Sequence, residues 1–149
     1  MNATMKLGVS SVLLMLAGGL ATYAPTASAQ VAPLKNTGNS RCMAVNASGG
    51  AITQACNGST IQRWTQTNTG SGFLIRNAAT GLCLNSNAGS VFTSACNSGN
   101  PSQRWLRLNV SATSARYRSS ATGLFVGSTS TGAVVVGPGS ASPLQIWAY

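Results

Sequence analysis

The feature that most constrains the fold is a triplet, Gln-x-Trp, that occurs three times at a nearly constant step. Successive tryptophans are 41 and 42 residues apart. The glutamines and tryptophans of the three triplets are Gln62 and Trp64, Gln103 and Trp105, and Gln145 and Trp147. A second set of landmarks keeps the same step, since Cys42, Cys83 and Phe125 are also 41 and 42 residues apart. A fixed period of this size predicts three repeated supersecondary units.

Within each unit the pattern favours short β-strands. In the second unit, residues 73–76, 82–84, 91–93 and 103–108 are the expected strands, and Asn, Gly and Ser fill the gaps between them. In the last run, alternation places Trp105 on one side and Arg104 and Leu106 on the other. No segment shows a helical period with caps. About four strands per unit predict an all-β fold of about twelve short strands, in a closed antiparallel body that leaves few exposed edges.

The first 29 residues are typical of a secretory signal peptide. Lys6 precedes a mostly apolar run over residues 7–24, and residues 27–29 form a small-x-small cleavage site. A transmembrane anchor is the alternative, but polar residues and glycines interrupt the run, and a clean span needs about 20 predominantly apolar residues. We therefore expect a secreted single domain over residues 30–149, with no membrane span.

Export predicts that the four cysteines, Cys42, Cys56, Cys83 and Cys96, form disulfides. Four cysteines allow three connectivities, and spacing alone does not choose among them. A structural zinc site is the rival, but it needs ligand pairs about two to four residues apart. The gaps here are 14, 27 and 13 residues, so we expect neither a metal nor a cofactor.

Composition restricts the chemistry further. The 149 residues include nine Lys and Arg but no Asp, Glu or His, which gives a formal charge of +9. Paired-carboxylate glycoside hydrolysis, Ser-His-Asp and Cys-His nucleophile systems, and carboxylate or histidine metal sites are thereby excluded. The sequence predicts a protein that binds and does not catalyse.

Taken together, these motifs resemble the ricin B-chain-type β-trefoil lectin domain. The resemblance rests on the three Gln-x-Trp triplets, the threefold step, and the run Thr-Gly-Leu-Cys-Leu at residues 80–84, which is echoed at 122–126. It covers residues 34–147 and implies a six-stranded barrel capped by three hairpins, with sugar binding at up to three sites. It also implies disulfides within a unit, Cys42–Cys56 and Cys83–Cys96. The third unit has Phe125 in place of its first cysteine, and apolar packing is expected there.

The motif residues themselves have two possible roles. The resemblance and the alternation place the three tryptophans in the core, where each buries a large apolar area. The alternative is that they contact a ligand. The three glutamines either bond to the backbone or contribute to the rim of a site.

A sugar site is expected only in the second unit. The family places an Asp just after the Cys-Leu pair, and the matching positions here are Ala44, Asn85 and Gly127. Only Asn85 has a side chain that forms hydrogen bonds. The family's aromatic residue is also missing near Gln54, Ser94 and Val136. The candidate sugar-binding residues are therefore Asn85, Phe92, Asn97, Asn100 and Gln103, and the alternative is that all three sites are degenerate.

The arginines have two interpretations, a solvated surface without a specific role or a binding function. Repeat-equivalent pairs such as Arg63 with Arg104, and Arg76 with Arg118, are spread around a threefold body, as on a solvated surface. The alternative is a cationic, non-enzymatic interaction module for anionic polymers or surfaces, because no acidic side chain repels them. No recognition helix is visible, so specific nucleic-acid binding is not expected. The expected partner is a carbohydrate, anionic ones included.

Overall fold

The computed structural model describes residues 29–149, so the predicted signal peptide lies outside the described residues except for Ala29. This part of the chain contains thirteen strands and three short 3-10 helices, and the repeat divides them into three units. The first unit contains β1 Val31–Pro33, β2 Lys35–Asn36, β3 Cys42–Val45, β4 Ala51–Gln54, η1 Thr60–Gln62 and β5 Arg63–Asn68. The second contains β6 Phe73–Asn77, β7 Cys83–Ser86, β8 Val91–Ser94, η2 Pro101–Gln103 and β9 Trp105–Ser111. The third contains β10 Ser114–Ser119, β11 Phe125–Ser128, β12 Val134–Gly137, η3 Pro143–Gln145 and β13 Trp147–Ala148.

The strand count exceeds the expected twelve by one because the first strand is interrupted. Leu34 alone separates β1 from β2, and it follows Pro33, which has no amide hydrogen to donate to a ladder. β1 pairs with β5, and β2 pairs with β13. The two pieces therefore act as one barrel strand with a break in the middle.

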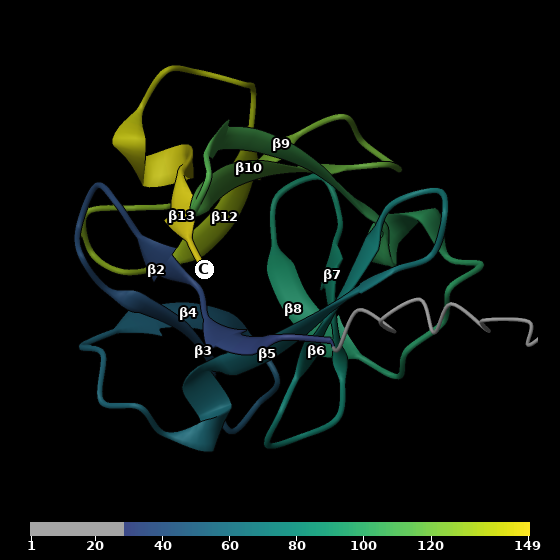
Figure 1. Cartoon of the computed structure of the whole chain (residues 1–149), viewed down its shortest axis with the longest axis horizontal. Helices are drawn as coiled ribbons and strands as arrows, with labels where there is room; N and C mark the ends of the chain where they lie inside the picture. The colour runs from purple at the N-terminus through teal and green to yellow at the C-terminus, as the bar shows by residue number, and fades with distance from the viewer. Residues whose placement is uncertain (1–28) are drawn as a thin grey trace, which may run out of the picture.

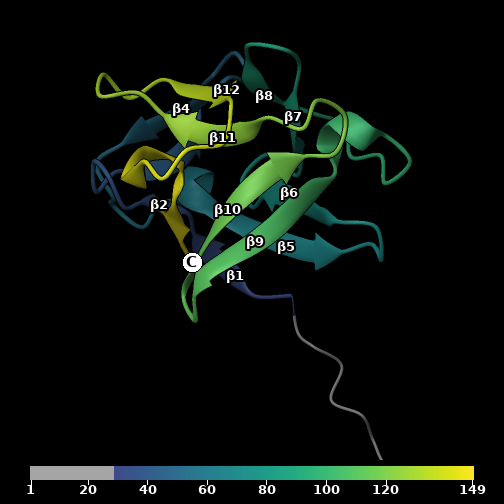
Figure 2. The ribbon, with the colours of Figure 1, turned by 90° about the horizontal axis from the view of Figure 1, so that it is seen from above.

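The pairing order closes a barrel. Strands run β1-β5-β6-β9-β10-β13-β2, and the break between β1 and β2 is a single residue, so the ring has six strands. The remaining strands form three hairpins, β3–β4, β7–β8 and β11–β12. Figure 1 shows the three units arranged around a common centre. In Figure 2 the hairpins lie at one end, while β1, β5, β9 and the C-terminus lie at the other, which we call the open end of the barrel. The all-β fold predicted from the repeat and the trefoil implied by the resemblance are both confirmed.

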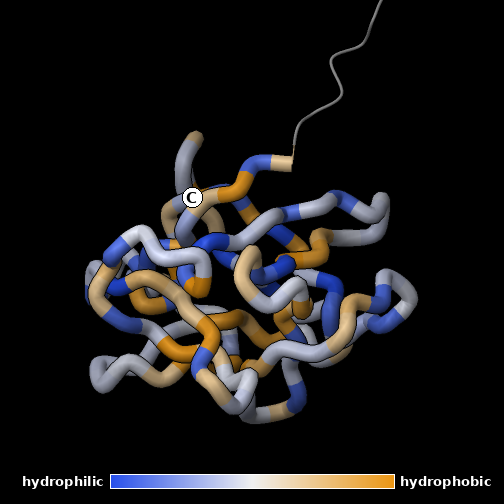
Figure 3. The backbone as a smooth tube through the Cα atoms, turned by 90° about the horizontal axis from the view of Figure 1, so that it is seen from below, coloured by the Kyte–Doolittle hydropathy of each residue, from blue (hydrophilic) through white to orange (hydrophobic). Residues whose placement is uncertain are grey.

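The core is centred on the three repeated tryptophans. Trp64, Trp105 and Trp147 are at most 1% exposed. Each indole N–H donates to a carbonyl 21 residues earlier in the chain: to Met43 at 2.9 Å, to Leu84 at 3.1 Å and to Val126 at 3.1 Å. Figure 3 shows apolar stretches alternating with polar ones along the tube, as expected when strands bury one face. In every unit the nitrogen of the buried indole therefore has a hydrogen-bond acceptor.

Disulfides join Cys42 to Cys56 and Cys83 to Cys96, the pairing that the resemblance implies. In the third unit Phe125 takes the place of the first cysteine, and Gly139 lies 14 residues later, the same separation as between Cys42 and Cys56. A β-carbon at Gly139 would lie 2.7 Å from the Phe125 ring. Close packing of the ring against a glycine therefore stands where the other units have a bridge.

The segment just before Trp105 is a 3-10 helix, where the sequence predicted the start of a strand. The predicted strand over residues 103–108 begins only at Trp105, because Gln103 is the last residue of η2. Pro101 opens this helix, and the side chain of Asn100 accepts a hydrogen bond from the amide of Ser102 at 3.0 Å. Proline at the first position and an asparagine cap stabilise a helical turn over a strand.

Replacing Trp105 with Phe tests the core contact. The variant Trp105→Phe removes the donor to Leu84 and part of a fully buried ring, so we expect a loss of about 2–4 kcal/mol in the free energy of unfolding. Urea denaturation measures it. Val110→Ala, an exposed position on the same strand, is the control and should change stability by less than about 0.5 kcal/mol. Equal effects of the two variants would contradict a core role for the indole.

Candidate functional site

Hairpin β7–β8 places two of the predicted site residues directly across from each other on neighbouring strands. Its register pairs Asn85 with Phe92 and Cys83 with Ser94. The disulfide from Cys83 to Cys96 then fixes the chain just beyond the end of β8. Asn85 is 8% exposed, whereas Phe92 is half-buried. An amide and an aromatic ring therefore occupy opposite positions on one hairpin.

The hydroxyl of Ser94 links the two carboxamides of the candidate site. Asn85 Nδ2 donates to Ser94 Oγ at 2.9 Å, and Gln103 Nε2 donates to the same oxygen at 2.7 Å. The structure thus joins Asn85 and Gln103 through a residue that sequence reasoning noted only for lacking an aromatic ring. The sequence feature that could have identified Ser94 is its place near the end of the predicted strand that pairs with the strand of Cys83.

The carboxamide oxygen of Asn85 lacks a hydrogen-bond donor. Oδ1 is buried and has no partner within residues 29–149. Leaving a buried acceptor unsatisfied costs about 1–3 kcal/mol, so such an atom calls for an explanation. A ligand hydroxyl is a donor of the required kind.

The two remaining asparagines shape the loop between β8 and η2. Asn97 is exposed and accepts a hydrogen bond from the amide of Gly99 at 2.9 Å. Asn100 is half-buried and accepts from Ser102, as described above. Both side chains therefore use their oxygen within the loop, and neither Nδ2 group donates to a protein atom in the described residues. The structure places all five predicted residues on hairpin β7–β8 or on the segment that follows it.

The three motif glutamines share one arrangement. Each Nε2 donates to a backbone carbonyl seven or eight residues earlier: Gln62 to Ala55, Gln103 to Ala95, and Gln145 to Pro138. Each Oε1 accepts from an amide five or six residues earlier, that of Asn57, Asn97 and Ser140 respectively. The carboxamide thus closes the loop that precedes the 3-10 helix in every unit. Of the two roles left open by the sequence, this geometry favours the backbone role.

The first and third units lack a comparable group. Ala44 pairs with Ile52 and is fully buried, and Gly127 pairs with Val135. A β-carbon on Gly127 would come within 3.1 Å of Gln145 Cγ, so the space beside it is already filled. The counterpart of Ser94 in the third unit is Gly137, which pairs with Phe125. Val136, which the sequence analysis named as lying near this position, is the residue before it.

Two further features bear on the chemistry. Within residues 29–149, no group of three or more His, Cys, Asp or Glu side chains could hold a metal ion. None of the helices in that range is long and apolar enough to cross a membrane.

The fold and the placement of these residues define a β-trefoil of the lectin type. The family model described as the ricin-type β-trefoil lectin domain matches residues 29–147, and the chain belongs to that family. No curated protein matches the sequence.

Solved structures support the same fold. A designed threefold-symmetric protein, ThreeFoil, has a TM-score of 0.70 at 17% identity, over 78% of this chain and 94% of its own. The hemolytic lectin CEL-III has a TM-score of 0.68 at 18% identity, over 80% of this chain and 29% of its own. The cytolethal distending toxin from Actinobacillus actinomycetemcomitans has a TM-score of 0.70 at 15% identity, over 83% of this chain and 92% of the matched chain. Identities this low establish the fold alone.

The structural role of the glutamines predicts matched losses of stability. Gln103→Leu and Gln62→Leu each remove the partners of one backbone amide and one carbonyl, so each should cost about 1–3 kcal/mol in the free energy of unfolding. Urea denaturation compares them. The two losses should agree within about 1 kcal/mol, although only Gln103 lies beside a candidate sugar site. A wild-type stability for Gln62→Leu would contradict the shared role.

Proposed function

We propose that this protein is a secreted carbohydrate-binding protein in which, of the three repeat-equivalent sites, only the one in the second unit binds a neutral sugar. Membership of the lectin-domain family supports carbohydrate binding in general. The observation that carries the location is the buried, unpartnered Oδ1 of Asn85. Of the three equivalent positions, only this one has a side chain that can bond to a hydroxyl.

In the proposed site, Asn85 is the central polar group. Its carboxamide both accepts and donates, so it can bond to two neighbouring hydroxyls of a sugar ring. Because Oδ1 is covered, binding includes a rotation of this carboxamide toward the opening through which 8% of the residue is exposed. This torsion is soft for asparagine, with no sharply preferred angle.

The other candidates support that central contact. Phe92, opposite Asn85, supplies an apolar surface of the kind that lines ligand sites. Asn97 and Asn100 present Nδ2 donors from the loop between β8 and η2. Gln103 is 1% exposed and holds the loop in place. The proposed site is thus a small set of neutral groups on a rigid hairpin.

The first and third units do not bind sugar in this proposal, since Ala44 and Gly127 leave no side-chain hydrogen bond there. Of the three repeat-equivalent positions, one then binds a sugar. Secretion follows from the predicted signal peptide over residues 1–29, and the two disulfides fit an oxidising compartment. The proposal includes no catalysis, because the chain has no Asp, Glu or His for proton transfer.

An Asn85→Leu variant tests the site. It keeps a side chain of similar size but removes both hydrogen-bonding atoms, so affinity should fall at least about tenfold, equivalent to about 1.4 kcal/mol. A glycan array identifies the ligand, and calorimetry with that glycan or galactose at about 0.15 M salt measures the affinity.

The matched control is Asn57→Ala in the first unit. Asn57, like Asn97, bonds through its backbone amide to the motif glutamine and accepts from an amide two residues on. This variant should bind within about twofold of wild type. Unchanged affinity of Asn85→Leu, or no glycan binding by folded protein, would reject the proposal.

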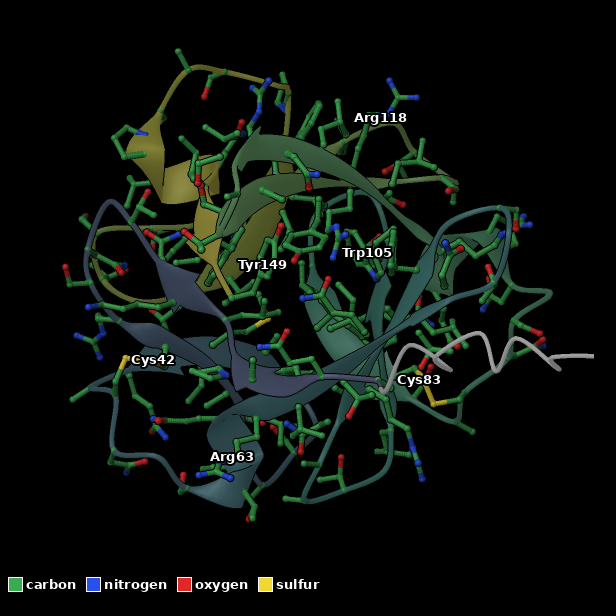
Figure 4. All side chains as sticks on the ribbon, in the orientation of Figure 1. Cys42, Arg63, Cys83, Trp105, Arg118 and Tyr149 are labelled. Carbon is green, nitrogen blue, oxygen red and sulfur yellow. A yellow bond between two sulfur atoms is a disulfide. The ribbon has the colours of Figure 1, made fainter. Side chains whose placement is uncertain are left out.

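A second candidate function is that of a cationic module for anionic polymers. The observation in its favour is the net charge of +9 with no acidic side chain, so no positive side chain has a side-chain counterion. Several of these charges are exposed; Figure 4 shows Arg63 and Arg118 at the periphery, and both are exposed.

Salt dependence separates the two functions. Binding of heparin by a diffuse cationic surface should weaken steeply between about 0.05 and 0.2 M salt, because counterions are released. Binding of a neutral sugar at Asn85 should barely change over that range. Calorimetry at both concentrations gives the comparison. A neutral-sugar affinity that falls as steeply as the heparin affinity would reject the Asn85 site as the binding locus.

A further inference from the structure

A cleft of about 540 Å³ lies at the open end of the barrel. It is lined by parts of the chain that are far apart in sequence: Gln30 and Ala32, strands β5 and β6, strand β9 and Tyr149, together with Ala29, the last residue of the predicted signal peptide. The polar and aromatic lining residues are Gln30, Gln66, Thr67, Asn68, Phe73, Arg107 and Tyr149. In Figure 2 this end, marked by β1, β5, β9 and the C-terminus, faces away from hairpin β7–β8. The cleft is therefore separate from the Asn85 site.

Two aromatic rings contact Arg107, the one charged side chain among the described residues that line the cleft. The guanidinium carbon of Arg107 lies 4.5 Å from the centre of the Phe73 ring and 5.1 Å from that of Tyr149. Figure 4 shows Tyr149 near the middle of the view, whereas Arg118 lies at the edge. Cation–π contacts with two rings restrict the guanidinium without neutralising its charge. Arg107 is thus held in place, while Arg118, on the neighbouring strand, is exposed.

Hydrogen bonds then orient the amide beside Arg107. Gln66 Oε1 accepts from the hydroxyl of Tyr117 at 2.9 Å and from Arg107 Nη1 at 3.4 Å. Burial raises the pKa of Tyr117, so its phenol remains a donor. With two donors on its oxygen, Gln66 leaves its Nε2 group without a protein acceptor in the described residues. Similarly, Asn68 Oδ1 accepts from the amide of Gly70 at 2.8 Å, which leaves Nδ2 as a donor.

Around Arg107 the cleft therefore offers a positive charge and the amide donors of Gln66 and Asn68, whose oxygens already accept hydrogen bonds. No acidic side chain exists anywhere in the chain to pair with Arg107. The planar fork of a guanidinium matches a carboxylate, which it can bind through two parallel hydrogen bonds. Aromatic rings with a few fixed amides are also typical of a ligand site. A sugar ring that carries a carboxylate complements both parts of this lining.

We propose that the open end of the barrel is a second binding site, for a carboxylate-bearing saccharide such as a uronic acid. Arg107 binds the carboxylate, and the amide donors of Gln66 and Asn68 bind the ring or hydroxyl oxygens. This site works independently of Asn85. In this site one restrained arginine binds the anion. On a diffuse cationic surface, by contrast, many exposed charges would each contribute a small part of the affinity.

Calorimetry with β-1,4-linked triglucuronate tests the proposal, with cellotriose as the uncharged counterpart. Triglucuronate should bind at about 0.15 M salt and cellotriose should not. Arg107→Met should weaken triglucuronate binding at least about tenfold. Arg118→Met removes the same charge from an exposed position of the neighbouring strand and should bind within about twofold of wild type.

Two further variants keep the result interpretable if Arg107→Met folds poorly. Gln66→Glu retains an acceptor for Tyr117 but places a carboxylate beside Arg107, so it should abolish triglucuronate binding. Asn85→Leu should leave this binding unchanged even where it removes neutral-sugar binding, which distinguishes failure of one site from failure of the other. Equal weakening by Arg107→Met and Arg118→Met, equal binding of cellotriose, or displacement of triglucuronate by inorganic phosphate as effectively as by glucuronate would overturn the proposal.

Discussion

The hydrogen bond from each buried tryptophan to the first strand of its own hairpin is the contact on which the rest of the structure depends. The three tryptophans lie at the start of barrel strands β5, β9 and β13. Their carbonyl acceptors lie on hairpin strands β3, β7 and β11. One side chain therefore fills the core and also joins the barrel to the cap. A missing donor would leave a buried carbonyl unpaired, so the contact specifies position as well as burial.

The candidate sugar site is attached directly to this contact. Asn85 follows Leu84, whose carbonyl accepts the indole N–H of Trp105, and Gln103 precedes that tryptophan by two residues. The same backbone frame exists in the other two units, where alanine and glycine replace Asn85. The repeat thus supplies three equivalent backbone positions, and in the proposed function only the one that carries Asn85 binds a sugar hydroxyl.

Much of this arrangement could be predicted from the repeated residues, because the same residue type at equivalent positions of three units indicates the same structural environment in each. The Gln-x-Trp spacing predicted the three units, and the residue pattern within a unit predicted short strands. The resemblance implied the trefoil and the disulfides that the structure contains. The role of the glutamines needed geometry, since a carboxamide can bond to backbone or ligand equally well. Nonrepeated features were harder: the break at Leu34, the helical turn ending at Gln103, and the shift that makes Gly137 the counterpart of Ser94. The cleft around Arg107 was beyond prediction, because its lining comes from all three units.

The absence of acidic side chains gives the two proposed sites different character. At Asn85 a neutral amide stands where the resemblance implies a carboxylate, and at Arg107 a cation is held by two aromatic rings in a chain that has no acidic side chain to pair with it. A crystal structure of the protein soaked with the best glycan from an array tests the central claim, a single neutral-sugar site in the second unit, most directly. The account predicts a sugar hydroxyl bonded to the carboxamide of Asn85, with no sugar beside Ala44 or Gly127. A sugar bound at either of those positions, with the hairpin β7–β8 empty, would contradict it.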